Sequence, residues 1–322
     1  MIWLTWRQHR KQALFTLLGL AALAALLVPT GLAMRHSFDS LGLADCLRTM
    51  GHGQFVPNTA ANQTCDTAMR RFSTRYSTLG LASVLLTFLP LLVGLFWGAP
   101  LVAREVEHGT HRLVWTQGVS RRRWALVKFG LVGTGVLAVS VGYGLGVMWW
   151  LEPLHRTGVS RLVVGAFDVQ GIAPVGYTLF AVALGIFTGT RWPRVLPAMA
   201  ALLAGFLGLR IGLTILGRPH YLAPRSLRFP VDAPNPDLNP VNGDWVQSME
   251  VHDGTGKLVM GDARIGCTPG DDCHGLGAGA YNLTLYQPGS RFWLFQGIET
   301  GIFVALALVL VYLAVRRIRR IA

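Results

Sequence analysis

The sequence predicts an all-α integral membrane protein with six transmembrane helices. An N-terminal interfacial helix precedes them, and a small disulfide-containing extracytoplasmic insert separates the fifth helix from the sixth. Composition supports this fold class, because 52% of the 322 residues are hydrophobic and only 14% are charged, with a mean hydropathy of +0.42. Soluble domains contain about 25% charged residues. Long apolar runs and a one-sided distribution of the +13 net charge are the other two observations.

Six segments are long and apolar enough to cross a bilayer, which needs about 20 residues for roughly 30 Å of hydrocarbon. The first is expected to remain in the protein, because its apolar run exceeds the roughly 7 to 15 residues of a signal peptide and no clear cleavage site follows. The predicted spans are residues 13–34, 79–102, 124–151, 171–189, 195–216 and 293–315.

Basic residues indicate how these spans are oriented. If the N-terminus is cytoplasmic, the cytoplasmic segments hold 15 Lys and Arg residues and only two acidic residues, Glu105 and Glu107. The extracytoplasmic segments then hold 13 basic and 13 acidic residues, so the whole net charge falls on one side, as the positive-inside rule requires. We therefore expect a multi-pass protein of the bacterial plasma membrane with both termini in the cytoplasm. Because the charge is spread over four short segments, nucleic acid is not an expected partner.

Residues 1–12 combine Trp3 and Trp6 with Arg7, Arg10 and a lysine. Tryptophan favours the headgroup level and basic side chains are attracted to anionic lipid, so this segment is predicted to be an interfacial helix anchored to membrane lipid. The alternative is that it only flanks the first span and orients it.

Four cysteines lie in the two long loops that this topology places outside the cytoplasm. Cys46 and Cys65 belong to the loop of residues 35–78, and Cys267 and Cys273 to a cap of residues 217–292. Disulfides persist in that compartment. Three pairings are possible, and the local choices are Cys46 with Cys65 and Cys267 with Cys273. A metal site is disfavoured because CTPGDDCH lacks the C-x2-C spacing.

The cap begins with PHYLAPRSLRFPVDAPNPDLNP, which is too rich in proline for regular structure to be expected. Two short apolar runs around HDGTG then predict a β-hairpin. We expect a small, loop-rich cap tied by a disulfide, followed by the sixth helix and a basic cytoplasmic tail over residues 293–322.

Glycine recurs at four-residue spacing inside the spans, which lets helix backbones approach closely. The spaced pairs are Gly94 and Gly98, Gly142 and Gly146, Gly185 and Gly189, Gly208 and Gly212, and Gly297 and Gly301. Some of these pairs are expected by chance among 38 glycines. The pattern predicts a closely packed and oligomeric bundle.

Two ionisable residues lie within the predicted spans. Arg210 and Glu299 each sit about six residues inside the outer end of their helix, which is roughly 9 Å below the surface at 1.5 Å per residue. Charged residues in a span rarely face lipid. We hypothesise that the two pair near the outer mouth of a pathway; the alternative is that each extends separately to the interface.

Motifs for catalysis are absent from the sequence. It has no G-x-x-x-x-G-K-[ST] run, no H-E-x-x-H and no G-x-S-x-G, so we expect no catalytic site and no bound cofactor or metal in this chain. The cytoplasmic loop of residues 103–123 holds Glu105 and Glu107, two carboxylates that could serve as acid and base. That side of the membrane offers no domain to form a substrate pocket, so a docking element is the favoured interpretation, with Ser120 as the N-cap of the third helix.

The stretch REVEHGTHRLVWTQGVSRRRWALVK resembles the E-x-E-x-G-T … S-R-x-x-x-x-x-K signature between the second and third helices of type-2 ABC exporter permeases. TWRQHR and YQPGSRFWLFQGIETG resemble an actinobacterial branch of that group. The resemblance implies a permease that dimerises and binds two ATP-binding subunits, with ATP and Mg bound in those partners. By position, Lys128 matches the final lysine. The residues expected to contact the ATP-binding subunit are Glu105, Glu107, Gly109, Thr110, Trp115, Gln117, Ser120 and Arg121.

The predicted function is therefore an ATP-driven exporter that moves an amphipathic, lipid-like, peptide-like or drug-like compound outward. The size and cysteine content of the outer loops depart from the family pattern, so no particular substrate is carried over. A membrane sensor that reads an extracellular ligand through residues 217–292 is the alternative from another class. A secondary transporter is a third, although Arg210 and Glu299 are few groups for coupling to an ion.

Overall fold

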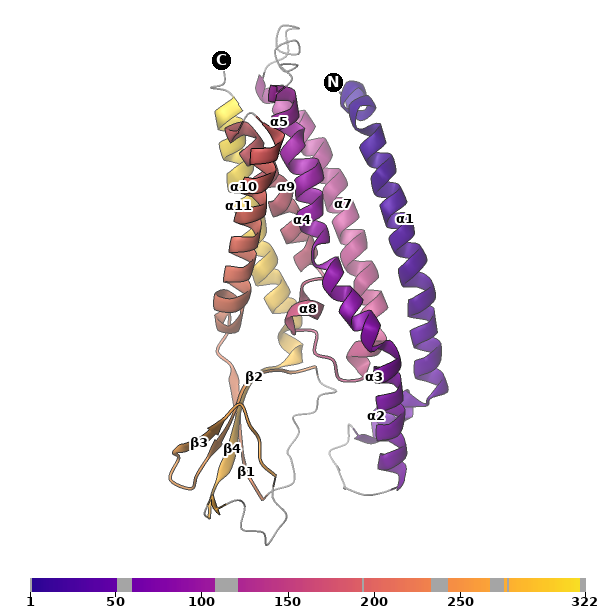
Figure 1. Ribbon diagram of the computed structural model, residues 1–322, viewed down its shortest axis with the longest axis vertical. Helices are drawn as coiled ribbons and strands as arrows, with labels where there is room; N and C mark the ends of the chain where they lie inside the picture. The colour runs from indigo at the N-terminus through magenta and orange to yellow at the C-terminus, as the bar shows by residue number, and fades with distance from the viewer. Residues whose placement is uncertain are drawn as a thin grey trace.

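The computed structural model describes residues 2–50, 60–107, 121–192, 194–232, 243–266, 275–276 and 278–318. It is a helical bundle with a small β-sheet at one end (Figure 1). We call this the sheet end, and the opposite end, which holds both termini, the terminal end. Within these described ranges, six helical segments are long and apolar enough to span a membrane, as predicted: Ala13–Ser40, Ser83–Glu105, Arg123–Arg156, Ala173–Arg191, Val195–His220 and Gly289–Ile318.

The first span belongs to one continuous helix, α1 (Ile2–Ser40). The predicted interfacial helix of residues 1–12 is therefore not a separate element, because residues 2–12 form the first turns of α1. Arg10 is exposed on it, whereas the side chains of Trp3, Trp6 and Arg7 lie outside the part of the chain that the structure describes.

Residues 35–78 are largely helical and not the loop that we expected. Helix α1 continues to Ser40, α2 spans Leu43–Met50 and α3 begins at Ala60 and runs to Leu86. Helical structure persists here because the polar segment still has an apolar face: Phe72 and Tyr76 of α3 pack in a buried cluster with residues of α1, α2 and α7. The predicted disulfide between Cys46 and Cys65 is present and ties α2 to α3.

The second span is interrupted. After α3 the chain forms α4 (Leu89–Val93), a π-helical turn η1 (Gly94–Gly98) and α5 (Ala99–Glu107). A π-helical turn inserts an extra residue into a helix and shifts its packing face. Here the turn lies against the fourth span, α9 (Ala173–Arg191), and α5 follows the same helix toward the terminal end.

Glycines allow this close approach between the second and fourth spans. A Cβ built at Gly94 would lie 2.7 Å from the Ala181 Cβ, and one at Gly98 would lie 2.7 Å from the Val182 carbonyl oxygen. A Cβ at Gly185 would lie 2.5 Å from the Ala99 nitrogen. Two of the predicted small-residue pairs therefore form one helix–helix contact. A Cβ at Gly208, Gly212, Gly297 or Gly301 would meet nothing within 4 Å among the residues that the structure describes.

Helix α9 is the central element of the bundle, and most of its side chains are buried. It packs against α4, α5 and three longer helices: α7 (Arg121–Arg156), α10 (Val195–Gly212) and α11 (Phe292–Ile318). A π-helical turn η2 (Leu213–Gly217) and a 3₁₀ turn η3 (Arg218–His220) extend the fifth span beyond α10.

The connection between α7 and α9 folds back into the bundle. It contains the short helix α8 (Val164–Phe167), which lies at the sheet end of the bundle in Figure 1. The residues from Phe167 to Gly171 are buried, although the first four of them lie outside the predicted span of residues 171–189. Gly171 has φ +70, and a Cβ built on Gly144 of α7 would lie 2.2 Å from its carbonyl oxygen, so glycine is needed at both positions.

The cap is a four-stranded antiparallel sheet of order β1-β4-β2-β3, followed by the 3₁₀ turn η6 (Gly289–Arg291) that leads into α11. Its strands are β1 (Arg225–Pro230), β2 (Trp245–His252), β3 (Leu258–Gly261) and β4 (Tyr281–Gln287). The β2–β3 hairpin around HDGTG is the predicted one.

Two other expectations for the cap have different outcomes. The proline-rich stretch was expected to lack regular structure but contributes β1, which is an edge strand, where proline is tolerated because one side needs no ladder hydrogen bonds. Cys267 and Cys273 lie outside the described residues, so their predicted disulfide stays a prediction.

The contact between the second and fourth spans is testable with two alanine substitutions. Gly185→Ala is expected to lower the thermal unfolding midpoint of the purified protein, because overpacking a close contact costs about 1–3 kcal/mol. Gly208→Ala is the matched control in another span, where the added methyl meets open space and the helix gains about 1 kcal/mol of propensity. Equal midpoints for the two variants would contradict the assigned packing.

Candidate functional site

Four charged side chains meet in the interior near the sheet end of the bundle. Asp168 comes from the connection after α8, Arg210 from α10, Arg218 from η3 and Glu299 from α11. All are buried, with 3%, 7%, 0% and 0% of their surfaces exposed, respectively. We call these four residues the buried ionic cluster. Its formal charges cancel, as buried charges must be paired to be tolerated.

Arg218 links the two acidic residues of the buried ionic cluster. Its Nη2 lies 2.6 Å from Asp168 Oδ1 and 2.8 Å from Glu299 Oε1, and its Nε donates to Glu299 Oε2 at 3.0 Å. The contact with Glu299 is therefore bidentate, a geometry that a guanidinium provides and an ammonium cannot. Arg210 extends the chain of charges, with its Nη2 3.1 Å from Asp168 Oδ2.

Aromatic side chains surround the cluster and complete its contacts. The Tyr177 hydroxyl donates to Glu299 Oε1 at 2.5 Å, and the Arg210 guanidinium lies 3.6 Å from the centroid of the Tyr177 ring. The Tyr221 hydroxyl, just beyond the fifth span, lies 3.4 Å from Glu299 Oε2. Burial raises the pKa of the Tyr221 phenol, and the neighbouring Glu299 carboxylate raises this pKa further. The phenol therefore stays protonated and can donate at neutral pH.

Backbone contacts hold Asp168 in this position. The Gln296 side chain of α11 accepts hydrogen bonds from the backbone nitrogens of Ile172 and Ala173 and donates to the Phe167 carbonyl oxygen. One glutamine therefore fixes both sides of the buried segment. The Arg218 guanidinium lies 4.2 Å from the centroid of the Phe167 ring, so the segment also packs on the cation it neutralises.

The predicted charges are found in one cluster but not as the direct pair that we hypothesised. Arg210 contacts Asp168, and Glu299 contacts Arg218; among the described residues no ion pair joins Arg210 to Glu299 directly. Asp168 and Arg218 were missed because both lie outside the predicted spans and were treated as loop residues. An acidic residue between apolar neighbours in a short connection, as in AFDVQG, is the signal that would have indicated burial.

Polar contacts also join the helices at the terminal end. Glu105 of α5 forms an ion pair with Lys128 of α7, whose Nζ also donates to the Leu101 carbonyl oxygen at 3.0 Å. The Glu107 carboxylate accepts a hydrogen bond of 3.1 Å from the backbone nitrogen of Val195, the first residue of α10. A carboxylate at this position is favoured because the N-terminus of a helix carries partial positive charge.

The other residues of the predicted coupling segment cannot be placed. Gly109, Thr110, Trp115, Gln117 and Ser120 lie outside the described residues. Helix α7 begins at Arg121, at the boundary that Ser120 was predicted to cap, but the side chain of Arg121 is not described. The contacts of these residues with a partner therefore stay predictions.

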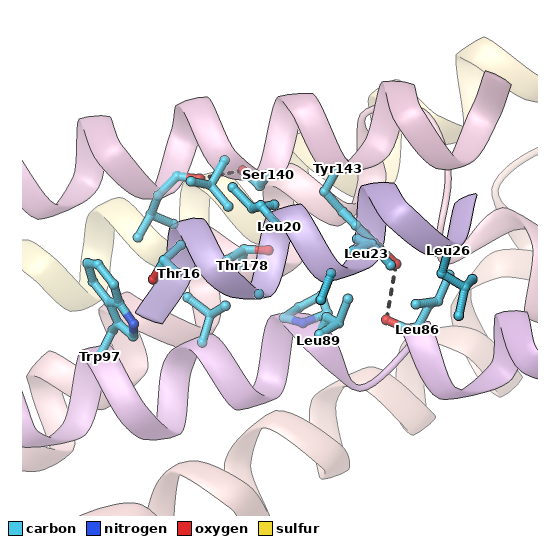
Figure 2. A pocket seen from close by; sticks show the side chains of 16 residues that line it. Thr16, Leu20, Leu23, Leu26, Leu86, Leu89, Trp97, Ser140, Tyr143 and Thr178 are labelled. Atoms are coloured by element: carbon cyan, nitrogen blue, oxygen red, sulfur yellow. Dashed lines mark hydrogen bonds between the residues drawn. The ribbon is translucent and has the colours of Figure 1, made fainter. Parts of the chain in front are cut away.

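A cavity of about 480 Å³ lies among α1, the broken second span, α7 and α9 (Figure 2). Its wall is almost entirely apolar, and Figure 2 shows leucine side chains of α1 facing it alongside Trp97 and Leu89 of the second span. Tyr143 lines it as well, with its hydroxyl donating to the Leu86 carbonyl oxygen at 3.1 Å.

Comparison with known proteins gives one match. A family model described as ABC-2 membrane transporter related matches residues 17–218. This region covers most of the first and fifth spans, all of the three spans between them, and three of the four residues of the buried ionic cluster. No curated protein and no solved structure matches the chain.

The buried ionic cluster predicts a strong dependence between two substitutions. Arg218→Met is expected to destabilise the protein by about 3–5 kcal/mol, because it leaves a buried negative charge without compensation. Adding Glu299→Gln removes that charge and keeps the Asp168–Arg210 pair, so the double variant should be more stable than Arg218→Met alone. Thermal or denaturant unfolding in detergent measures both effects. If the losses of the single variants simply add, the two side chains are not coupled.

Proposed function

The chain belongs to the ABC-2 membrane transporter related family, and on this basis we propose that it is the permease subunit of an ATP-driven exporter. The family is one of ABC transporter membrane components, and such a component pairs with an ATP-binding subunit. The six apolar helices agree with a multi-pass membrane protein. We further propose that two copies of this chain assemble with two ATP-binding subunits, which bind ATP and Mg.

The arrangement at the terminal end is the observation that best supports this function. The segment between α5 and α7 is short, and its first flank is tied to two other helices: Glu105 to α7 and Glu107 to α10. On the same side the Arg317 Nε of α11 donates to the Thr190 carbonyl oxygen of α9 at 3.1 Å. A force applied to residues 108–120 by an ATP-binding subunit would therefore be transmitted to the second, third and fifth spans together.

We propose outward transport because the sequence resembles exporter permeases. With both termini cytoplasmic, the ATP-binding subunits meet the terminal end and the sheet lies outside the cell. Closure of the ATP-binding subunits tilts the spans and opens the sheet end, which gives alternating access. The buried ionic cluster lies near that end, so its contacts hold the spans together before opening. We propose that the substrate is an amphipathic, lipid-like, peptide-like or drug-like compound.

Glu107 provides a test of coupling that separates charge from hydrogen bonding. Glu107→Gln keeps an oxygen that accepts from the Val195 nitrogen but loses the charge, whereas Glu107→Ala loses both. If the carboxylate contacts the ATP-binding subunit, both variants should reduce the substrate-stimulated ATPase activity of the complex, by about tenfold for a charge-assisted contact of 1.5 kcal/mol or more. The measurement is ATP hydrolysis by the purified complex in vesicles.

Asp253 on the cap is the matched acidic control, since it lies at the β2–β3 turn, at the other end of the molecule. Asp253→Asn should leave ATP hydrolysis unchanged. Activity retained by Glu107→Gln and lost by Glu107→Ala would show that Glu107 only caps α10. Normal export by a variant with alanine at both Glu105 and Glu107 would refute the coupling role.

A further inference from the structure

The wall of the cavity among α1, the second span, α7 and α9 offers no charge and little hydrogen bonding to a ligand. The Ser140 hydroxyl donates to the Val136 carbonyl oxygen at 2.8 Å, and that of Thr178 donates to the Pro174 carbonyl oxygen at 2.6 Å. The Tyr143 hydroxyl likewise donates to a backbone carbonyl oxygen, that of Leu86. Pockets for drug-like compounds combine apolar walls with a few polar groups that orient the ligand. The wall therefore favours a hydrocarbon chain over a ligand that carries charge or several polar groups.

The dimensions of the cavity match one leaflet of a bilayer. Along α1 its lining runs from Thr16 to Leu26, which is about 15 Å at 1.5 Å per residue. The hydrocarbon core of a membrane is about 30 Å thick, so each leaflet contributes about 15 Å. Figure 2 shows Thr16 and Trp97 at one end of the cavity and Leu26 and Leu86 at the other. The end at Thr16 is the one nearer the N-terminus, and Leu26 lies near the middle of the first span, Ala13–Ser40.

Exposed basic residues lie beyond the Thr16 end of the cavity. Arg10 is six residues before Thr16 on α1, and Arg104 is seven residues beyond Trp97, so each lies about 9–11 Å farther toward the terminal end. When the cavity spans the hydrocarbon of that leaflet, the backbone at both positions lies just beyond the headgroup layer, which is about 5–8 Å thick. A long arginine side chain reaches from there to the headgroups. Basic side chains at this level attract anionic lipid.

From these three observations we infer that the cavity binds one acyl chain of an anionic phospholipid from the leaflet on the terminal side, with the headgroup near Arg10 and Arg104. The inference goes beyond the proposed function by naming a ligand class and its site. Binding of the acyl chain requires a membrane but neither ATP nor transport. The test therefore uses the permease without an ATP-binding subunit.

Photolabelling tests the site directly. The full-length protein is placed in phosphatidylcholine nanodiscs that contain a small fraction of phosphatidylglycerol with a photoreactive diazirine near the end of one acyl chain, and labelled residues are identified by mass spectrometry. The expected result is labelling of residues that line the cavity on α1 and α7. Labelling spread evenly over the exposed apolar faces of α10 and α11 would overturn the assignment.

Two glycines provide a matched pair of variants. A Cβ built at Gly19, which lines the cavity, or at Gly135, which is on α7 but does not line it, meets nothing within 4 Å, so both positions accept a side chain without a clash. Gly19→Phe fills the cavity and should reduce labelling about tenfold, the effect of losing the burial of about two methylene groups. Gly135→Phe should leave it unchanged. Equal labelling of the two variants contradicts the proposal, provided that both elute as single species with unchanged unfolding midpoints.

The headgroup preference is tested with Arg10→Gln and Arg104→Gln. Each substitution should reduce labelling by the phosphatidylglycerol probe about fivefold. One basic residue near the membrane surface contributes about 1 kcal/mol to the binding of anionic lipid, which corresponds to that factor in affinity. The same diazirine chain on phosphatidylcholine is the control probe, and its labelling should not respond. Equal labelling of the unaltered protein by the two probes would overturn the anionic preference. Crosslinks between residue 19 and a second copy of the chain would contradict lipid binding and show that the cavity lies at a contact between two copies.

Discussion

The structure at the sheet end of the bundle is constrained by the free energy of burying charged side chains in a medium of low dielectric constant. An isolated ion in such an interior costs on the order of 20 kcal/mol relative to water, and only close pairing offsets that cost. Asp168, Arg210, Arg218 and Glu299 can therefore be buried only together. Because they come from four separate segments, the requirement for neutrality also fixes how those segments meet. The fold-back of the connection after α8 and the position of η3 both satisfy this constraint, and the Gln296 hydrogen bonds hold the connection in place.

Close backbone approach plays the corresponding role in the rest of the bundle. Lipid provides no hydrophobic force between helices, so helices associate through packing and small residues. Gly94, Gly98 and Gly185 let the second span lie directly on α9, and the π-helical turn shifts the register to match. On the other side of the second span, the apolar cavity lies between this span and α1. One span is thus packed tightly on one face and loosely on the other.

The sequence allowed the spans to be predicted, because 20-residue apolar runs and one-sided charge are direct consequences of a bilayer. It did not reveal the helices over residues 43–50 and 60–78, whose polar composition hides an apolar face that packs only in three dimensions. Arg210 and Glu299 were found because a charge inside a span is visible in one dimension. Their partners Asp168 and Arg218 were not, because burial of a connection is decided by tertiary contacts such as those of Gln296.

The order of the four charges along the chain bears on how the protein is inserted during synthesis. Asp168 emerges first, then Arg210 and Arg218, and Glu299 comes only with the final helix. Until that helix arrives, the partial assembly carries one uncompensated positive charge at the sheet end. The arriving carboxylate neutralises it, so the last helix is drawn to a defined place and orientation among the earlier ones. A chain that terminates before Glu299 would lack this final step and retain an uncompensated positive charge at the sheet end.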